Sequence, residues 1–429
     1  TQRTFSPQSC ERMASTILRA SLGRVTSLAN DTGVIEKQRN YDTERKASAK
    51  RMQRGMMQHV IDGTTSRTSG PLRLDPAVYA DPVRFEAEKR ELFRKLPLFV
   101  GLTRDMPDPG DKILFDAVGP SILVVRNKEG RVNAFLNMCT HRAAKLVKQC
   151  DSATRMSCPF HAWTFDLDGK LVGLPGAKGF EGIDRSALSL IRVPAIEWHG
   201  MIFVKATPSD EEIDIEAYLG DFAPELAQQD FASARPVKST RLEFKSNWKY
   251  ALDTYGEGYH FGPLHPDTIG AMSLTDVMFY DGFPPHHRIG FPRKEMVEDA
   301  RLSEDQWPEI PRGGIHLLFP NTIIQVEKMG PDLEFVYGFY RLFPGNHVGE
   351  GFSLMSNYRP GDVPEDEDDA PWVEVHDLVM RVVTTEDYSV SEGGQNNLVH
   401  APESFRSVLG SNEIALQRFH RQVAERIGF

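Results

Sequence analysis

Two mixed cysteine–histidine pairs constrain this chain more than any other feature. One residue separates Cys139 from His141, and two residues separate Cys158 from His161. Two short loops that each present a thiolate and an imidazole can hold a 2Fe-2S cluster, with both cysteines on one iron and both histidines on the other. Such a set can also hold a structural zinc ion, but zinc motifs usually place cysteine with cysteine and histidine with histidine. The mixed pairs therefore favour the iron-sulfur cluster over zinc.

The residues around the second pair support the same interpretation. Pro159 and Phe160 lie inside the loop, and the stretch from Trp163 to Gly169 is typical of a strand that ends in a tight turn. We expect Met138 and Phe160 to shield the cluster from water.

This segment resembles the Rieske domain of the Rieske-type non-haem iron oxygenases, whose usual pattern is C-x-H-R-G followed later by C-P-x-H-x-W. Ala143 stands where that family usually has glycine, so we expect a local difference in the backbone after His141. Rieske proteins of respiratory chains carry an additional cysteine in each loop, and the corresponding residues here are Ala144 and Phe160. The resemblance therefore implies an oxygenase rather than a pure electron-transfer subunit.

Length and composition set broad limits on the protein. A chain of 429 residues suggests about two to three domains, and a net charge of −10 gives no electrostatic support for binding nucleic acid. No apolar run approaches the ~20 residues of a membrane helix, so we expect a soluble, cytoplasmic protein. Cys10 and Cys150 lie outside the two pairs, and we expect free thiols there in a reducing compartment.

The pattern of residues along the chain predicts an α+β fold in three parts. Residues 1–94 are expected to form an N-terminal helical arm that packs on the catalytic domain. Residues 95–207 are expected to form a small antiparallel β domain that carries the cluster loops. Residues 208–429 are expected to form a catalytic domain with an antiparallel sheet and flanking helices. The first residues also have the composition of an organelle transit peptide, although we prefer the helical arm.

Several individual elements can be predicted within these parts. Asp81 is suited to cap a helix that begins at Pro82. A short helical link is expected at 213–225, and helices at 372–381 and 411–427. Strands are expected at 113–115, 121–125, 132–136, 171–174, 201–204, 317–319, 322–326 and 334–343.

A second group of candidate ligands lies near the middle of the chain. His260 and His265 are five residues apart, which on an ideal helix turns them about 140° away from each other. Gly262 and Pro263 can break the helix and let the two imidazoles converge. One carboxylate would complete a 2-His-1-carboxylate iron site that leaves positions open for dioxygen and substrate. The histidine pair is weak evidence by itself, because many histidines are only hydrogen-bonded in protein cores.

The resemblance to the oxygenases supplies the third ligand. The family has an E-x-Y-H-x4-H or D-x-Y-H-x4-H stretch, which residues Glu257 to His265 match. Its third ligand is an aspartate in a later segment like E-D-x-x-x-x-E-x-x-Q, which Glu386 to Gln395 match. The resemblance therefore implies Asp387 as the iron ligand. Glu386 is the rival ligand, and a helix cap or surface acid is the alternative role for Asp387.

Two further acids have roles implied by the resemblance. In the family, the acid at the position of Glu257 links the two metal centres by bonding to a cluster histidine of the neighbouring subunit and to an iron ligand. Most ring-hydroxylating members have aspartate at this position. The glutamate of this chain is similar to that of the members that hydroxylate quaternary ammonium compounds. Those members have two nearby cysteines, which Gly258 and Phe261 replace here. Asp253 is expected near the iron, where it would orient water or substrate; otherwise it caps a helix or pairs with Lys249.

Other polar and aromatic residues near these motifs receive simpler predictions. His286 and His287 follow two prolines, which suits a pocket loop or a surface turn, and we expect the surface turn. Tyr259 and Trp248 are expected to be packing residues.

The resemblance implies the terminal oxygenase component of a multicomponent oxygenase. A reductase that uses NAD(P)H would reduce the cluster, directly or through a ferredoxin. The electron would then pass between subunits of a homotrimer, through Glu257, to mononuclear Fe(II), where dioxygen is activated. The substrate would be a small organic molecule, aromatic or quaternary ammonium, that is hydroxylated or demethylated by a mono- or dioxygenase reaction. A non-catalytic Rieske electron carrier with a ligand-binding domain is the alternative, and a zinc-stabilised interaction protein is the third.

Overall fold

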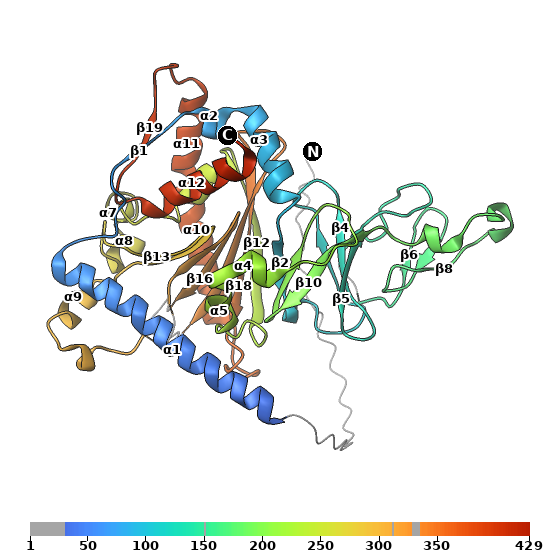
Figure 1. The fold of residues 1–429 in the computed structure, drawn as a ribbon, viewed down its shortest axis with the longest axis horizontal. Coiled ribbons are helices and arrows are strands. Elements are labelled where there is room, and N and C mark those ends of the chain that lie inside the picture. Colours follow the sequence, from blue (N-terminus) through green and yellow to red (C-terminus); the bar gives the residue numbers. More distant parts are fainter. Residues whose placement is uncertain (1–30, 150–151, 311–312, 328–334) are drawn as a thin grey trace.

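The computed structural model combines helices with antiparallel sheets, which confirms the predicted α+β class (Figure 1). It describes residues 31–149, 152–310, 313–327 and 335–429. Cys10, Cys150 and the predictions for residues 1–30 lie outside the described residues. The boundaries of the three parts remain predictions.

Three small sheets form the part of the molecule on the right of Figure 1. The predicted strands in this part are confirmed. The four-stranded sheet has the order β3–β4–β5–β9 (Lys112–Phe115, Ile122–Arg126, Val132–Leu136, Arg192–Val193). The first three-stranded sheet has the order β10–β11–β2 (Ala195–Trp198, Met201–Val204, Leu98–Leu102). The second has the order β6–β7–β8 (Met156–Ser157, Thr164–Phe165, Leu171–Gly173). Gly169 forms the turn before β8 with φ 81°, and a Cβ there would come within 2.4 Å of the Phe135 ring, so the turn requires glycine.

One seven-stranded antiparallel sheet forms the centre of the larger part. Its order is β12–β18–β17–β16–β15–β14–β13 (Arg235–Phe244, Gly351–Arg359, Val336–Pro344, Thr322–Glu327, Ile315–Leu318, His286–Gly290, Phe279–Phe283). Its helices are α4 to α9 (Ile215–Leu219, Ala223–Ala227, Trp248–Asp253, Phe261–Leu264, Ile269–Met272, Met296–Asp299) and α10 to α12 (Ala370–Val382, Tyr388–Val399, Ile414–Ile427). α10 contacts β12 and β18, and α6 contacts β17. The predicted link and terminal helices are confirmed.

The predicted cap at the start of α3 (Pro82–Glu88) is also confirmed. The Asp81 carboxylate accepts hydrogen bonds from the backbone N–H groups of Val83 at 2.7 Å and Arg84 at 3.4 Å, and Pro82 is the first helical residue. α2 (Ala77–Ala80) precedes it, and a π-helical turn (Lys89–Phe93) follows. β1 and β19 (Leu72–Leu74, Ser407–Leu409) pair the segment before α2 with the segment before α12.

The N-terminal helix α1 (Asp31–Asp62) crosses the lower left of Figure 1 and contacts α5, α9 and β13. Met52, Met56 and Met57 are buried on the side that faces these elements. Arg51 pairs with Asp281 at 2.8 Å across this contact. The expected N-terminal helical arm therefore contains a long helix.

The prediction of a surface turn at His286 and His287 is wrong. Both belong to β14, an inner strand, and their side chains are 1% and 5% exposed. His286 Nε2–H donates to the carbonyl of Tyr218 at 3.0 Å, and its Nδ1 accepts the N–H of Phe319. Burial lowers the pKa of His286 to about 4 and that of His287 to about 3, so both imidazoles are neutral at neutral pH.

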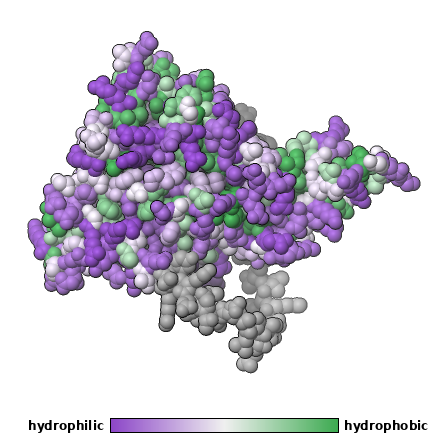
Figure 2. Space-filling view, viewed as in Figure 1, coloured by the Kyte–Doolittle hydropathy of each residue, from purple (hydrophilic) through white to green (hydrophobic). Residues whose placement is uncertain are grey.

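Hydrophilic side chains cover most of the face in Figure 2, and the hydrophobic residues on it form separate patches. Among the described residues, no helix combines the length and the apolar character needed to cross a membrane.

Candidate metal sites

The two Cys–His loops have the same backbone hydrogen bonds. The N–H of Cys139 donates to the carbonyl of Ala144 at 2.9 Å, and the N–H of Ala143 donates back to the carbonyl of Cys139 at 2.9 Å. The second loop repeats both bonds with the N–H of Cys158 to Trp163 at 2.7 Å and the N–H of Ala162 to Cys158 at 3.0 Å. The two loops therefore share one backbone frame, in which the histidine is the third residue of the first loop and the fourth residue of the second.

The four side chains of these loops form one group, in which both cysteines are buried and both histidines are half-buried. Cys139 and Cys158 are buried, and the rings of His141 and His161 have centroids 4.6 Å apart. Within the described part of the chain, the Nδ1 atom of each histidine is buried without a hydrogen-bond partner. A buried nitrogen without a partner is costly unless something else binds it. Two thiols and two such nitrogens fit a 2Fe-2S cluster with Cys2His2 ligands.

The fifth residue of each loop, counted from its cysteine, adopts the left-handed conformation, with φ 58° at Ala143 and 56° at Ala162. Glycine adopts this conformation readily, whereas a residue with a Cβ is destabilised in it by about 1–2 kcal/mol. The closing bond from the N–H of Ala143 to Cys139 depends on this conformation. Ala143 therefore holds a backbone conformation that glycine would adopt more easily, and this lowers the stability of the loop.

Replacing Ala143 by glycine is expected to stabilise the protein by about 1 kcal/mol, because the left-handed conformation then carries no steric penalty. The control is Ala144→Gly at a position without positive φ, which should destabilise by roughly 0.5–1 kcal/mol. Urea unfolding of the cluster-loaded protein measures both changes. Equal destabilisation by the two variants would contradict the interpretation.

His260, His265 and Asp387 come together in the larger part, with their nearest ligand atoms all within 4.8 Å of one another. The two histidines flank the single turn of α7, and His265 leaves the helical conformation with φ −117° and ψ 42°. Asp387 ends a π-helical turn, η7 (Val383–Asp387), between α10 and α11. Its Oδ1 lies 3.7 Å from Nε2 of His260 and 3.4 Å from Nε2 of His265.

Two glutamates fix the orientation of these imidazoles. His260 Nδ1–H donates to Glu257, and His265 Nδ1–H donates to Glu386 at 2.5 Å. This leaves both Nε2 atoms directed at Asp387 and able to bind a metal, as is usual for metal-binding histidines. Glu386, the rival candidate for the iron ligand, therefore contacts Nδ1 of His265, whereas Asp387 faces Nε2. Burial lowers the pKa of His265, but Asp387 and Glu386 outweigh this effect, so its pKa is above the ordinary value.

Glu257 and Asp253, the two acids predicted to act in catalysis, have different surroundings. The Glu257 carboxylate accepts hydrogen bonds from His260 Nδ1–H and from two backbone N–H groups, those of Tyr259 and His260. Asp253 does not line the cavity described below. Its carboxylate accepts the Tyr79 hydroxyl at 2.5 Å and lies 3.0 Å from Nε2 of His420. Lys249, the partner in the alternative role of Asp253, pairs with Glu88 instead.

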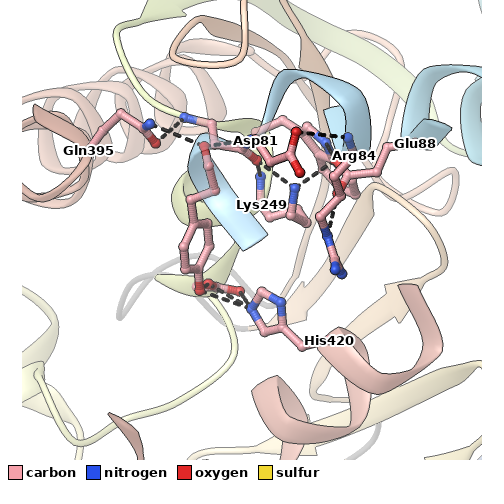
Figure 3. Close-up of polar contacts among 10 residues, drawn as sticks. Asp81, Arg84, Glu88, Lys249, Gln395 and His420 are labelled. Atoms are coloured by element: carbon pink, nitrogen blue, oxygen red, sulfur yellow. Dashed lines mark hydrogen bonds and ion pairs between the residues drawn. The ribbon is translucent and has the colours of Figure 1, made fainter. Parts of the chain in front are cut away.

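Buried polar contacts hold α6, the helix that leads to these ligands. Figure 3 shows this network, with Gln395 at one end and His420 at the other. Lys249 Nζ pairs with Glu88 at 2.6 Å, and both side chains are 0% exposed. Glu88 also accepts the Trp248 indole N–H at 2.9 Å. Burial lowers the pKa of Lys249, and the charge of Glu88 opposes that shift.

Replacing Glu88 by glutamine is expected to destabilise the protein by about 3–5 kcal/mol, because Lys249 would remain buried without its counter-charge. Urea unfolding measures the change. Glu86→Gln is the matched control, since its ion pair with Lys89 is exposed and is worth less than about 1 kcal/mol. Equal effects of the two variants would show that the buried pair has no special importance.

The three converging residues lie in the wall of a cavity of about 370 Å³. Most of its lining is apolar and comes from α10, η7, the turn around α7 and the inner face of β15 to β17. Its polar side chains include Gln325 and Glu327 of β16 and Arg293. Tyr340 O–H donates to Gln325 at 2.9 Å, and Gln325 Nε2–H donates to Glu327 at 3.2 Å. A cavity of this size and lining has room for a small organic molecule beside the three candidate metal ligands.

Comparison with known families agrees with this geometry. Residues 97–191 match the family described as "Rieske [2Fe-2S] domain", and residues 231–428 match "Ring hydroxylating alpha subunit (catalytic domain)". The first match contains both Cys–His loops and the second contains the three converging residues, and together they cover more than half of the chain. The chain belongs to the Rieske oxygenase alpha-subunit family.

Relatives in this family include three oxygenase subunits. The carnitine monooxygenase oxygenase subunit of Acinetobacter pittii is 31% identical over 46% of this chain and 53% of its own length. The glycine betaine monooxygenase oxygenase subunit of Chromohalobacter salexigens is 30% identical over 48% and 46%. The benzene 1,2-dioxygenase alpha subunit of Pseudomonas putida is 26% identical over 50% and 49%. The matched chain thus spans about half the length of these relatives.

Solved structures of the family have the same fold. A quaternary ammonium Rieske monooxygenase in complex with L-carnitine superposes with a TM-score of 0.69 at 22% identity, covering 82% of this chain and 95% of that one. A naphthalene 1,2-dioxygenase mutant bound to phenanthrene gives a TM-score of 0.65 at 19% identity, covering 85% and 94%.

Two aromatic residues near the family motifs differ from prediction. Tyr259 is 61% exposed rather than packed, in the turn whose backbone N–H groups bind Glu257. Phe160 is 55% exposed although its ring centroid lies 3.8 Å from that of His161, so it covers one face of that histidine while remaining in contact with water. Trp248 is buried, as predicted.

Proposed function

We propose that this chain is the terminal oxygenase component of a multicomponent Rieske oxygenase. The observation that carries the proposal is the convergence of His260, His265 and Asp387 in the wall of a largely apolar cavity. A chain that only carried electrons would need no such set. The two histidines, each oriented by a glutamate, and Asp387 give the 2-His-1-carboxylate arrangement of non-haem iron oxygenases.

Each group of residues has its own role in this proposal. Cys139, His141, Cys158 and His161 would hold the 2Fe-2S cluster, and His260, His265 and Asp387 would hold Fe(II). When bound, the cluster supplies single electrons, and the mononuclear iron supplies open coordination positions for dioxygen.

The surrounding residues prepare the second site for that chemistry. Glu257 and Glu386 hold the Nδ1 protons of the two histidines, which keeps the Nε2 lone pairs available. The apolar wall from α10 and η7 excludes water and leaves room for a small substrate beside the site. We place Glu257 between the two metal centres, because it bonds directly to His260 and stands beside exposed Tyr259.

The substrate that we propose is a small organic molecule of the quaternary ammonium or aromatic type. Glutamate at position 257 and the carnitine and glycine betaine relatives support the first type, and the benzene dioxygenase relative supports the second.

A homotrimer and a separate electron donor complete the proposal. In Figure 1 the loops near β6 lie at the opposite end of the molecule from α7. This arrangement favours a ring in which the cluster loops of one subunit meet Glu257 of the next. The donor would be a reductase, or a ferredoxin reduced by one.

Oxygen consumption tests the proposed function. The metal-loaded protein, supplied with an NAD(P)H-dependent reductase, is screened against trimethylammonium compounds and aromatic acids under labelled dioxygen. We expect one class to give a product that contains the label, and no product with Asp387→Ala. Label-free products, or equal turnover by Asp387→Ala, would refute the proposal.

A further inference from the structure

Helix α1 covers a second cavity next to the catalytic one. Its volume is about 430 Å³, and its apolar lining includes Met52, Met56 and Met57 of α1 and Met296 of α9. We call this space the methionine compartment. Methionine side chains are flexible and polarizable, so a surface made of them adapts to apolar ligands of different shapes.

The methionine compartment adjoins the catalytic cavity. Phe291, Arg293 and Glu327 line both spaces. The two spaces therefore meet at these three side chains. A molecule that is too long for the catalytic cavity would reach the methionine compartment by displacing them.

The chemistry changes along this path. At the junction, the hydrogen-bonded series Tyr340, Gln325 and Glu327 presents polar groups. Burial raises the pKa of Glu327, and nearby Arg293 opposes that shift. Beyond the junction, the methionines of α1 offer apolar surface, and the same compartment is also lined by the acids Glu295, Asp299 and Glu309. The combined space suits a molecule with a polar group at the junction and an apolar portion beyond it.

The wall that α1 contributes is firmly attached. Ser48 Oγ–H donates to Glu225 at 2.6 Å and accepts from Arg288 at 2.8 Å, and these three side chains are buried. Gln53 Nε2–H donates to the carbonyl of Pro308 at 2.7 Å beside the compartment. A helix held by buried polar contacts at this position can define the shape of a binding site.

We propose that the methionine compartment binds the apolar portion of an elongated amphipathic substrate whose reacting end lies beside His260, His265 and Asp387. Helix α1 is then a specificity element, with Met52 and Met56 setting the length and shape of the molecules accepted. This inference rests on the proposed function for the reaction itself, but the binding that it predicts can be measured without turnover.

Calorimetric titration of the metal-loaded protein under anaerobic conditions tests the inference. The probes are two series, n-alkyltrimethylammonium salts and n-alkanoates, with chains of four, six, eight and ten carbons. Each methylene group buried in an apolar site strengthens binding, so in the series whose head group is accepted we expect at least about a tenfold lower Kd for the eight-carbon probe than for the four-carbon probe.

Variants of Met56 locate the effect. Met56→Trp should narrow the compartment and reduce the eight-to-four-carbon ratio to less than about threefold, whereas Met56→Leu keeps the volume and should retain the ratio. Gln58→Trp, at an exposed position of α1, should also retain it. Thermal unfolding and metal content verify that each variant is folded, and Met52→Trp replaces Met56→Trp if the latter is not.

Two results would overturn the inference. One is an eight-carbon probe that binds no more tightly than the four-carbon probe in both series. The other is a length dependence that persists unchanged in folded Met56→Trp or Met52→Trp. Length-dependent binding without any oxygenation would leave the compartment standing and count against the proposed function alone.

Discussion

Replacing His260 by alanine is expected to remove the mononuclear iron and leave the 2Fe-2S cluster intact. Iron content should fall from about three to about two atoms per chain, and substrate turnover should be lost. The reason is that His260 and His265 are the two nitrogen ligands that the structure directs at Asp387, and one histidine with one carboxylate binds iron much more weakly. Metal analysis and EPR of the reduced protein measure both centres.

The control for this variant is His347→Ala. His347 is exposed in the turn between β17 and β18, so its loss should change neither iron content nor turnover. An unchanged iron content in His260→Ala, or a simultaneous loss of the cluster, would contradict the assignment of His260 to a separate mononuclear site.

Replacing Glu257 by glutamine is expected to keep all the iron and to lower turnover by roughly 10–100-fold, the usual effect of losing a group that orients a metal ligand. Glutamine has the size of glutamate and can still accept the backbone N–H groups that Glu257 binds. It lacks the negative charge that holds the Nδ1 proton of His260. Oxidation of the prereduced cluster, followed optically after mixing with substrate and oxygen, should slow by a similar factor.

Glu257→Asp is the companion variant because it keeps the charge on a shorter side chain. It should retain more of the rate than Glu257→Gln. Normal turnover and normal cluster oxidation in Glu257→Gln would remove the bridging role that we propose for this residue.

Local sequence patterns predicted the loops and the main elements well. The spacing of the Cys–His pairs, the cap at Asp81 and the apolar periodicity of residues 411–427 depend on neighbours in the chain, and such features are found in the expected places. The break predicted at Gly262 and Pro263 lies elsewhere, because both residues belong to α7 and the helical conformation ends at His265. Asp387 required the resemblance to a family, because its distance in sequence carries no local signal.

Other features could not be predicted because they depend on how distant segments meet. The partners of Asp253 are an example, because Tyr79 and His420, from α2 and α12, hold its carboxylate. No spacing links these three residues. The burial of His286 follows from the position of β14 inside the sheet, whereas the two prolines before it indicated only a turn.

The cavity illustrates the same limit. Ile323, Gln325 and Glu327 alternate along β16 and share one face, as strand geometry requires. Which face looks toward α10 is decided by the register of the whole sheet. The role of α1 in covering the methionine compartment likewise emerges only when a helix near the N-terminus is placed beside β13 and α9.

Metal content together with optical and EPR spectra, before and after reduction with dithionite, tests the central claim most directly. We expect about three irons per chain, a Rieske signal that appears on reduction, and loss of only the third iron in Asp387→Ala. Zinc in a colourless protein, or two irons that remain two after ferrous reconstitution, would contradict the claim that this chain carries both an electron-transfer centre and an oxygenase centre.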